Sequence, residues 1–370
     1  MKTRAAVLLE QGRPWEILEL DLDDPGPGEV RVKMKVAGLC HSDKHVKVGG
    51  GARFPIVAGH EGAGVVDAVG DGVDSVAPGD NVAISWIPAC GRCRWCNDGQ
   101  SNLCDLGANM MTGELAAGGF RFHHEGQDLG GEGAVGTFSE YTVVNERSVV
   151  KIDDDTPLEH ASLVSCGVTT GWGAVVNAGG ARPGDAIAIY GCGGIGANAV
   201  RAAAALGPDL LVVIEPVEWK RDFAKQQGAD LVFADAEQAQ AEVWERTRGV
   251  GVDIAVVTTG VASAEVTGQA FALTRKGGKI VLVSTADDMM EDTVVLPGSL
   301  LTFFQKTVVG TLFGHCNPHS DVPKMLRMAR DGKLNLDGLV TRRYSLDDVN
   351  KGFDDLLAGE NIRGVIAFDN

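Results

Sequence analysis

Long hydrophobic runs are missing from this sequence of 370 residues, and no stretch of about 18 apolar residues occurs in it. We therefore expect no membrane-spanning helix. The opening MKTRAAVLLEQ is charged and lacks a continuous apolar segment, so we expect no signal peptide. Together these absences indicate a cytoplasmic protein.

Positive charge is also scarce. Lys and Arg together number 33 against 50 Asp and Glu, which gives a formal net charge of −17. Nucleic acids and anionic lipid surfaces attract basic proteins, so we expect neither as a partner. We interpret the acidity as a solubilising surface.

The composition that remains is that of a soluble globular protein, with 44% hydrophobic and 22% charged residues. A chain of this length is too long for one compact core, so we expect two domains. Strand patterns dominate from about residue 4 to residue 142, where EVRVKMKV alternates apolar and polar side chains.

The rhythm changes at about residue 186, where strands and helices begin to alternate. The apolar run AIAIY is followed by the alanine-rich ANAVRAAAALG, which we expect to be a helix, and then by LLVVIE. Four more expected strands follow, namely LVF at 231, DIAVVTT at 253, KIVLVS at 279 and TVVGTLF at 307. This order predicts an α/β fold with a parallel sheet covered on both faces.

Four of the eight cysteines lie in the short loop CGRCRWCNDGQSNLC, at Cys90, Cys93, Cys96 and Cys104. In a reducing compartment such a cluster binds metal more often than it forms disulfides. Bacterial ferredoxins differ from this spacing, because their fourth cysteine comes after three residues and precedes proline. We predict a structural zinc ion with four thiolate ligands, a closed site that leaves no position for a substrate.

The string GCGGIG follows the run AIAIY directly and contains the pattern G-x-G-x-x-G at Gly191, Gly193 and Gly196. Such glycines permit a tight turn and let the backbone approach a pyrophosphate at a helix N-terminus. Glu215 ends the next strand 19 positions after Gly196, where a carboxylate is expected to bind the ribose hydroxyls.

A carboxylate at this position repels a 2′-phosphate, so the sequence favours NAD(H) over NADP(H). Lys220 and Arg221 follow closely and weaken that preference. The alternative interpretation is a plain strand-to-helix turn beside a solvated glutamate.

The other four cysteines are Cys40, Cys166, Cys192 and Cys316. Cys40 opens CHSDKH, and His60 follows 20 residues later in AGHEGAG. Catalytic zinc commonly takes three protein ligands, two cysteines and one histidine being a known set, and leaves a fourth position for water or substrate. We predict this set at Cys40, His60 and Cys166, although a lone cysteine such as Cys166 is most often a small buried hydrophobe. We interpret Cys192 and Cys316 as inert.

These motifs resemble those of the zinc-dependent alcohol dehydrogenases of the medium-chain dehydrogenase/reductase superfamily. GLCHSDKH, GHEGAGVV, the four-cysteine loop, GCGGIG and the closing NIRGVIAF occur in the order found in that family, nearly from end to end. The segment from Leu106 to Thr137, with RFHHEGQD, further resembles the nicotinoprotein branch that uses N,N-dimethyl-4-nitrosoaniline as an artificial acceptor. In that branch NAD stays bound through turnover and an external carrier reoxidises it.

The resemblance implies an α/β chain with a GroES-like, mainly-β catalytic domain at residues 1–167 and 313–370, including the zinc loop 90–104. A doubly wound Rossmann domain at residues 168–312 is inserted in it and binds NAD. The family further implies two zinc ions per chain, one catalytic and one structural, an alcohol or aldehyde substrate, and a homodimer or homotetramer.

The resemblance also implies roles for residues around the catalytic zinc. Ser42 matches the hydroxyl of the proton relay and His45 its outer base, since histidine accepts protons near neutral pH. Asp43 matches the carboxylate that binds the second ring nitrogen of His60, and Glu61 an acidic neighbour that approaches the zinc during ligand exchange. Trp86 matches an aromatic residue of the substrate pocket.

For the cofactor, the resemblance implies contacts with the nicotinamide, the pyrophosphate and the adenosine. These contacts fall on His41, Thr170, Gly191, Gly193, Gly194, Ile195, Gly196, Glu215, Lys220 and Arg363. His41 occupies a pyrophosphate position where many relatives carry arginine, so the charge contact there is weaker.

Two other functions share these motifs. An S-hydroxymethyl-thiol dehydrogenase, which oxidises formaldehyde adducts, has both zinc sites, but its anionic substrate requires a basic pocket that we do not find. A nucleotide-binding structural protein would not need Cys40, His60, Cys166, Ser42 and His45 together. We therefore expect reversible hydride transfer between an alcohol and NAD, giving an aldehyde or a ketone.

Overall fold

The computed structural model describes residues 1–49, 51–284 and 294–369, and the chain divides into two compact units. The first unit comprises Met1–Cys166, Cys316–Gly332 and Leu336–Asn370, and the second comprises Gly167–His315 and Lys333–Asn335. The first unit is therefore built from both ends of the chain and the second from its middle.

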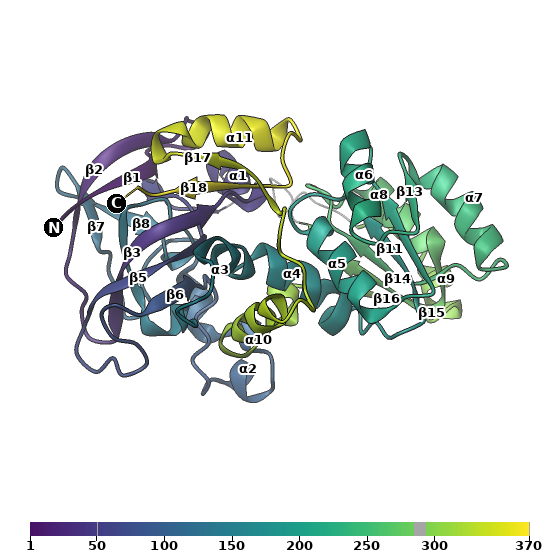
Figure 1. Ribbon diagram of the computed structural model, residues 1–370, viewed down its shortest axis with the longest axis horizontal. Helices are drawn as coiled ribbons and strands as arrows, with labels where there is room; N and C mark the ends of the chain where they lie inside the picture. Colours follow the sequence, from purple (N-terminus) through teal and green to yellow (C-terminus); the bar gives the residue numbers. More distant parts are fainter. Residues whose placement is uncertain (50, 285–293, 370) are drawn as a thin grey trace. The chain divides into compact units, whose positions relative to one another are not determined.

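A closed barrel and a mixed sheet form the first unit (Figure 1). Within the described residues the barrel has the order β1-β2-β7-β8-β4, with bounds Lys2–Leu8, Glu16–Leu22, Phe122–His124, Gln127–Gly131 and Ile56–Val57. The sheet has the order β10-β6-β5-β3-β18-β17, with bounds Val149–Lys151, Asn81–Ile84, Glu61–Val69, Glu29–Gly38, Arg363–Ala367 and Val340–Tyr344, and β9 (Tyr141–Asn145) also pairs with β3.

Alternation in the sequence explains strand β3, since EVRVKMKV buries one set of side chains and half-exposes the other. The C-terminal end of β3 lies next to two other strands of the sheet. Gly38, the last residue of β3, pairs with Glu61 of β5 and with Val365 of β18. A side chain at Gly38 would collide with Glu61 and crowd Arg363, so glycine permits this close approach.

Helices of the first unit are short and pack around these sheets. Their bounds are His41–Val48 for α1, Arg94–Asn97 for α2, Leu158–Val164 for α3, Pro318–Arg330 for α10 and Val349–Leu357 for α11. Phe138, Met34, Leu39 and Phe353 belong to the main core cluster beneath them.

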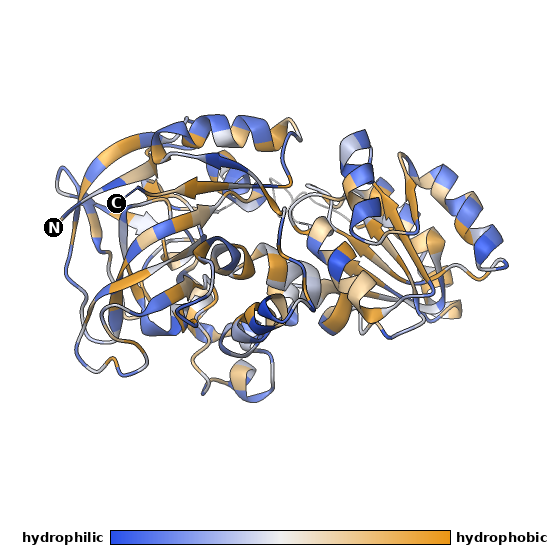
Figure 2. Cartoon of the chain, viewed as in Figure 1, coloured by the Kyte–Doolittle hydropathy of each residue, from blue (hydrophilic) through white to orange (hydrophobic). Residues whose placement is uncertain are grey.

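A parallel sheet forms the second unit. Among its described residues the strand order is β13-β12-β11-β14-β15-β16, with bounds Leu231–Phe233, Leu210–Ile214, Ala186–Tyr190, Val252–Val257, Thr274–Leu282 and Thr307–Gly310. The strands β11 and β12 are buried at every position, as near-continuous apolar runs are in parallel sheets. Figure 2 shows this apolar character along the strands, whereas α6 and α7 carry much hydrophilic surface.

Helices alternate with the strands of this sheet and pack on them (Figure 1). Their bounds are Gly167–Gly173 for α4, Gly196–Leu206 for α5, Glu218–Gln226 for α6, Ala236–Arg246 for α7, Ala264–Leu273 for α8 and Gly298–Phe303 for α9. Helix α5 is followed by the capping residue Gly207, which has the left-handed φ of 68° that favours glycine. The expected α/β architecture with a doubly wound parallel sheet is confirmed.

None of the helices in the described part of the chain has the length and apolar character that crossing a bilayer requires.

Candidate functional site

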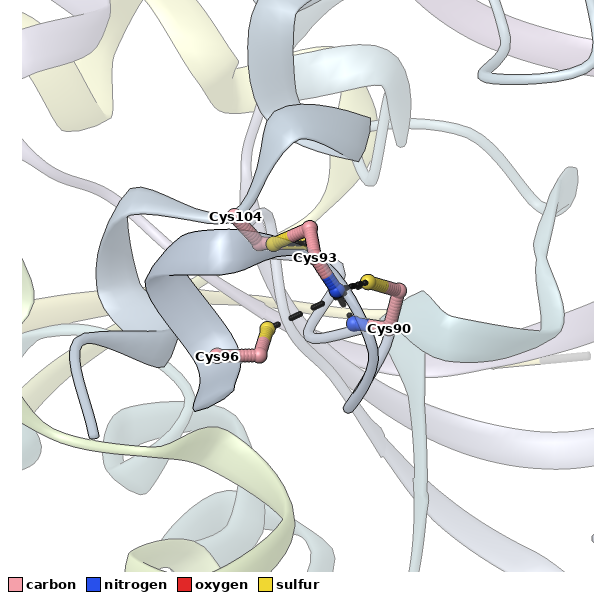
Figure 3. Close-up of side chains that lie close together, drawn as sticks. All are labelled: Cys90, Cys93, Cys96 and Cys104. Carbon is pink, nitrogen blue, oxygen red and sulfur yellow. Dashed lines mark hydrogen bonds between the residues drawn. The ribbon is translucent and has the colours of Figure 1, made fainter. Parts of the chain in front are cut away.

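The four-cysteine loop brings its sulfur atoms together, as Figure 3 shows. Sγ of Cys90 lies 4.0 Å from Sγ of Cys96, and Sγ of Cys93 lies 3.9 Å from Sγ of Cys104. Four sulfurs bound to zinc at about 2.3 Å in a tetrahedron would lie about 3.8 Å apart. The loop therefore has the dimensions of a four-thiolate zinc site.

Backbone N–H groups of the loop support the charged form of these sulfurs. The N–H groups of Arg92 and Cys93 donate to Sγ of Cys90, and that of Cys90 donates to Sγ of Cys104. Hydrogen bonds from the backbone of Asp105 and Cys96 lower the pKa of Cys93 to about 6. The four cysteines fill all four coordination positions of such an ion and leave none for a substrate. A metal bound here would therefore stabilise the loop and take no part in catalysis.

A second cluster, Cys40, His60, Glu61 and Cys166, is buried, and its ligand atoms lie within 4.8 Å of one another. Cys40 is the N-cap of α1, His60 precedes β5, Glu61 begins β5, and Cys166 follows α3. Gly59 makes the turn into His60 with a φ of 87°, and a side chain there would collide with Phe138.

Hydrogen bonds orient the predicted ligands. Nδ1 of His60 lies 2.7 Å from Oδ1 of Asp43, and Oδ2 of Asp43 accepts the backbone N–H of Cys40 at 2.9 Å. With a carboxylate at Nδ1, that nitrogen carries the proton and Nε2 is available to a metal. The hydroxyl of Ser42 lies 3.2 Å from Sγ of Cys40 and 3.3 Å from Nε2 of His60.

The ionisable groups of this cluster shift one another's pKa values strongly. The hydrogen bond with Cys166 holds the pKa of Cys40 well below its ordinary value despite burial, and the same bond, together with burial, raises the pKa of Cys166 well above its ordinary value. Burial opposes protonation of His60, but the charge of Asp43 together with hydrogen bonds to Asp43, Cys166 and Cys40 outweighs burial and raises the pKa of the imidazole well above its ordinary value. A cation at this position would neutralise the acidic groups.

Glu61 and Arg363 form a buried ion pair beside the cluster. Burial raises the pKa of Glu61, and the neighbouring Arg363 guanidinium opposes that shift. The second oxygen, Oε1, is buried, has no hydrogen-bond partner among the described residues and lies 4.0 Å from Nε2 of His60. An orphaned carboxylate oxygen at this point fits a metal ion as its neighbour.

Sequence reasoning missed one residue of this region, Glu132. Its carboxylate accepts the backbone N–H of Gly59 at 2.9 Å and lies 3.3 Å from Nδ1 of His60. Burial, and then the charge of Glu132, raise the pKa of Asp43 well above its ordinary value. The surrounding GGEGAVG carries no motif that would have identified it.

Other predicted residues lie beside the cluster. The ring of Trp86 meets His60 edge-on, with centroids 5.9 Å apart. His41 and His45 face each other on α1, with centroids 5.0 Å apart, and His45 is buried. Cys192 and Cys316 are buried outside both cysteine clusters, and burial raises the pKa of Cys192 to about 12.

In the second unit the glycine turn has the shape that a pyrophosphate needs. Gly191 has a φ of 89°, and a side chain at Gly196 would collide with the carbonyl of Gly191. A side chain at Gly193 would instead occupy open space, so its absence leaves the backbone accessible. Gly194 and Ile195 complete the turn before α5 begins at Gly196.

The predicted ribose carboxylate lies against this turn. Oε2 of Glu215 accepts the N–H of Cys192 at 2.7 Å, and Oε1 accepts that of Val217 at 2.9 Å. Lys220 is buried on α6 with its ammonium group over the ring of Trp219. Thr170 is buried in α4 of the same unit. The residues of the turn thus fit a dinucleotide.

Two family models match the chain, the alcohol dehydrogenase GroES-like domain at residues 26–154 and the zinc-binding dehydrogenase domain at residues 194–331. The chain is 52% identical to a putative alcohol dehydrogenase D of Mycobacterium tuberculosis, covering 99% of this chain and 100% of the relative. It is 50% identical to the NDMA-dependent alcohol dehydrogenase of Amycolatopsis methanolica, with 99% of each chain covered. The chain belongs to the zinc-dependent alcohol dehydrogenases.

A solved structure agrees with this family. The benzyl alcohol dehydrogenase of Acinetobacter calcoaceticus matches with a TM-score of 0.91 and 28% identity, over 100% of this chain and 99% of that one. The expected GroES-like and Rossmann architecture is therefore confirmed, as is an oxidoreductase that acts on alcohols. Zinc and NAD(H) are its cofactors, and a set of two cysteines and one histidine is the one known for the catalytic zinc of alcohol dehydrogenases.

Proposed function

We propose that Cys40, His60 and Cys166 hold the catalytic zinc of this alcohol dehydrogenase and that Ser42 and His45 carry the proton away from the substrate. The position of the Ser42 hydroxyl supports this most directly. Its oxygen lies 3.2 Å from Sγ of Cys40 and 3.3 Å from Nε2 of His60, the two atoms that would bind the metal. A substrate hydroxyl at the fourth metal position would lie next to it.

A zinc ion held by Cys40, His60 and Cys166 would act as a Lewis acid and lower the pKa of a bound hydroxyl group. The thiolates of Cys40 and Cys166 would balance the charge of the bound metal. Ser42 would accept the proton of a substrate hydroxyl while it donates its own, and His45, three residues later on α1, would be the final acceptor. Trp86 narrows the pocket beside His60.

NAD(H), held at Gly191, Gly193, Gly194, Ile195, Gly196, Glu215 and Lys220, with His41, Thr170 and Arg363 as further contacts, supplies the hydride acceptor. Glu215 orients the ribose, and its charge excludes a 2′-phosphate. We further propose that NAD stays bound and that an external carrier reoxidises it. The 50% identity to an NDMA-dependent relative supports this proposal.

The assignment of residues 1–167 and 313–370 to the catalytic domain and of 168–312 to the NAD-binding domain belongs to the same proposal. We also propose a homodimer or homotetramer located in the cytoplasm, where the metal-binding thiols stay reduced.

Removing one ligand at each metal site tests the assignment. We expect Cys40→Ala to lower the zinc content from two ions per chain to one and to abolish alcohol oxidation, with the thermal midpoint little changed. The matched change Cys93→Ala also removes one zinc but acts on the loop, so we expect a lower thermal midpoint. Elemental analysis measures the zinc content, and calorimetry measures the thermal midpoint. A rate assay compares ethanol, benzyl alcohol and formaldehyde with glutathione, each with N,N-dimethyl-4-nitrosoaniline (NDMA) or NAD as the acceptor.

Two zinc ions per chain in the Cys40→Ala protein would contradict the ligand assignment. Preference for formaldehyde with glutathione over both simple alcohols would replace the proposed substrate class by a thiol adduct.

A further inference from the structure

Both carboxylate oxygens of Glu132 contact the segment that carries His60. Oε2 accepts the backbone N–H of Gly59 at 2.9 Å, and Oε1 lies 3.3 Å from Nδ1 of His60. Only 5% of the surface of Glu132 is exposed to solvent, so water competes little for these contacts.

The backbone around Glu132 fixes its position. Its carbonyl accepts the N–H groups of Val135 and Gly136, at 3.0 and 3.1 Å. Two further backbone bonds join the segment to the two residues that precede His60, from Thr137 N–H to the carbonyl of Gly59 and from Phe138 N–H to that of Ala58. Glu132 is thus a rigid part of the support of His60.

Gly133 allows the segment to approach this closely. It has a φ of 63°, and a Cβ atom there would lie 2.9 Å from Cβ of Trp86 and 3.4 Å from Cβ of His60. The backbone next to Glu132 therefore packs directly against the metal ligand and the pocket aromatic.

Asp43 and Glu132 divide the support of His60 between two elements. Asp43, on α1, makes the shorter contact with Nδ1 at 2.7 Å and also binds the N–H of Cys40. Glu132 reaches the same ring nitrogen from the other segment and also binds the peptide N–H of Gly59. One carboxylate couples His60 to the sulfur ligand, and the other couples it to its own backbone.

We propose that Glu132 is a second positioning residue for His60, one that fixes the imidazole and the preceding peptide and thereby retains the catalytic metal. This inference rests on the proposed function, because it takes Cys40, His60 and Cys166 as the ligands. Carboxylates that bind a ligating histidine typically change metal affinity by about 10–100-fold when removed.

The holoprotein tests the proposal through the rate at which a chelating dye removes zinc. We expect Glu132→Ala to accelerate the loss of one zinc per chain by about 10–100-fold and to leave the loop zinc unaffected. Glu132→Gln keeps an acceptor for the Gly59 N–H but loses the charge, so its rate should be intermediate and remains informative if the alanine variant does not fold. In the cobalt-substituted protein, the visible spectrum of the catalytic ion should shift in both variants, because the ring orientation changes.

Glu29 provides the matched control. It is also a buried glutamate that accepts a backbone N–H, from Gly26 at 2.9 Å, but its charged partner is Arg121. We expect Glu29→Gln to lower the thermal midpoint and to leave zinc release and the cobalt spectrum unchanged. This separates positioning of the metal ligand from general loss of stability.

Zinc release and a cobalt spectrum equal to wild type in both Glu132 variants would overturn the proposal and leave the proposed function intact. A third zinc per chain, lost in Glu132→Gln, would also overturn it, because Asp43, His60 and Glu132 would then bind a cation of their own. A wild-type protein that holds only the loop zinc would remove the proposed catalytic site itself and this inference with it.

Discussion

Ser42 and His45 lie on the same face of α1, because residues three positions apart in a helix are neighbours. Ser42 contacts the ligand atoms of Cys40 and His60, and His45 is buried one turn further along. In the proposed relay a proton would pass from Ser42 to His45, since histidine accepts protons near neutral pH.

We expect His45→Gln to slow hydride transfer near neutral pH by up to about 100-fold, because glutamine cannot accept the proton. The rate should recover at higher pH, where hydroxide in the solvent replaces the missing base. Single-turnover measurements across the pH range detect this effect, with His319→Gln, an exposed histidine on α10, as the control. A pH–rate profile identical to wild type would exclude His45 from the relay.

Residue types and spacing were enough to predict the four-cysteine loop, whereas Cys166, far from Cys40 and His60 in the sequence, was a weaker prediction that the family resemblance supported. Cysteine and histidine are uncommon, and their spacing in a loop reflects the tetrahedron they surround. Glu132 could not be predicted this way, because glutamate is common and its contact with Gly59 spans 73 positions. Only the pairing of residues 58–60 with residues 132–138 brings the carboxylate to His60.

At the scale of elements, apolar runs predicted the parallel strands well, because the central strands β11 and β12 are buried at every position and read as continuous apolar runs. The barrel was harder to predict. Its strands β4 and β8 pair in parallel over two positions only, Ile56 with Gly130 and Val57 with Gly131, and no sequence pattern specifies so short a pairing.

His123 of β7 joins three elements of this barrel. Its Nε2 lies 2.9 Å from Oδ2 of Asp23, just after β2, and its Nδ1 lies 2.9 Å from Oδ1 of Asp128 in β8. Burial opposes protonation, but the hydrogen bonds and charges of Asp23 and Asp128 outweigh it and raise the pKa of His123. The protonated histidine therefore stabilises the folded barrel.

The sign of the pH dependence follows from the raised pKa. The contribution of His123 is fully present below the ordinary histidine pKa of about 6.5 and is lost as the pH rises through the higher pKa of the folded state. We expect His123→Gln to lower the urea midpoint more at pH 6 than at pH 9, with His124→Gln on the same strand as the control. An equal loss at both pH values would show that the ion pairs contribute nothing.

At the scale of the whole molecule, composition and length predicted two domains, but not that the first one is built from both ends of the chain. That expectation came from the resemblance of motifs near residues 40 and 360 to one family. Its physical basis is the pairing of β18 with β3, which places Val365 opposite Gly38. A strand of the C-terminal segment thereby completes the sheet in which Glu61 lies and from which β3 leads to Cys40.

The proposed retention of NAD concerns the whole enzyme, since a cofactor that never leaves must be reoxidised in place. We expect purified protein, freed of small molecules by gel filtration and then denatured with acid or heat, to release about one NAD or NADH per chain. Turnover with alcohol and NDMA should then proceed without added NAD. Glu215→Ala should lower the retained amount, because the carboxylate that orients the ribose is gone, whereas Glu218→Ala, an exposed glutamate at the start of α6, should not. Release of no nucleotide, together with a strict requirement for added NAD, would show that the cofactor dissociates in each cycle, and the chain would then act as an ordinary NAD-dependent alcohol dehydrogenase.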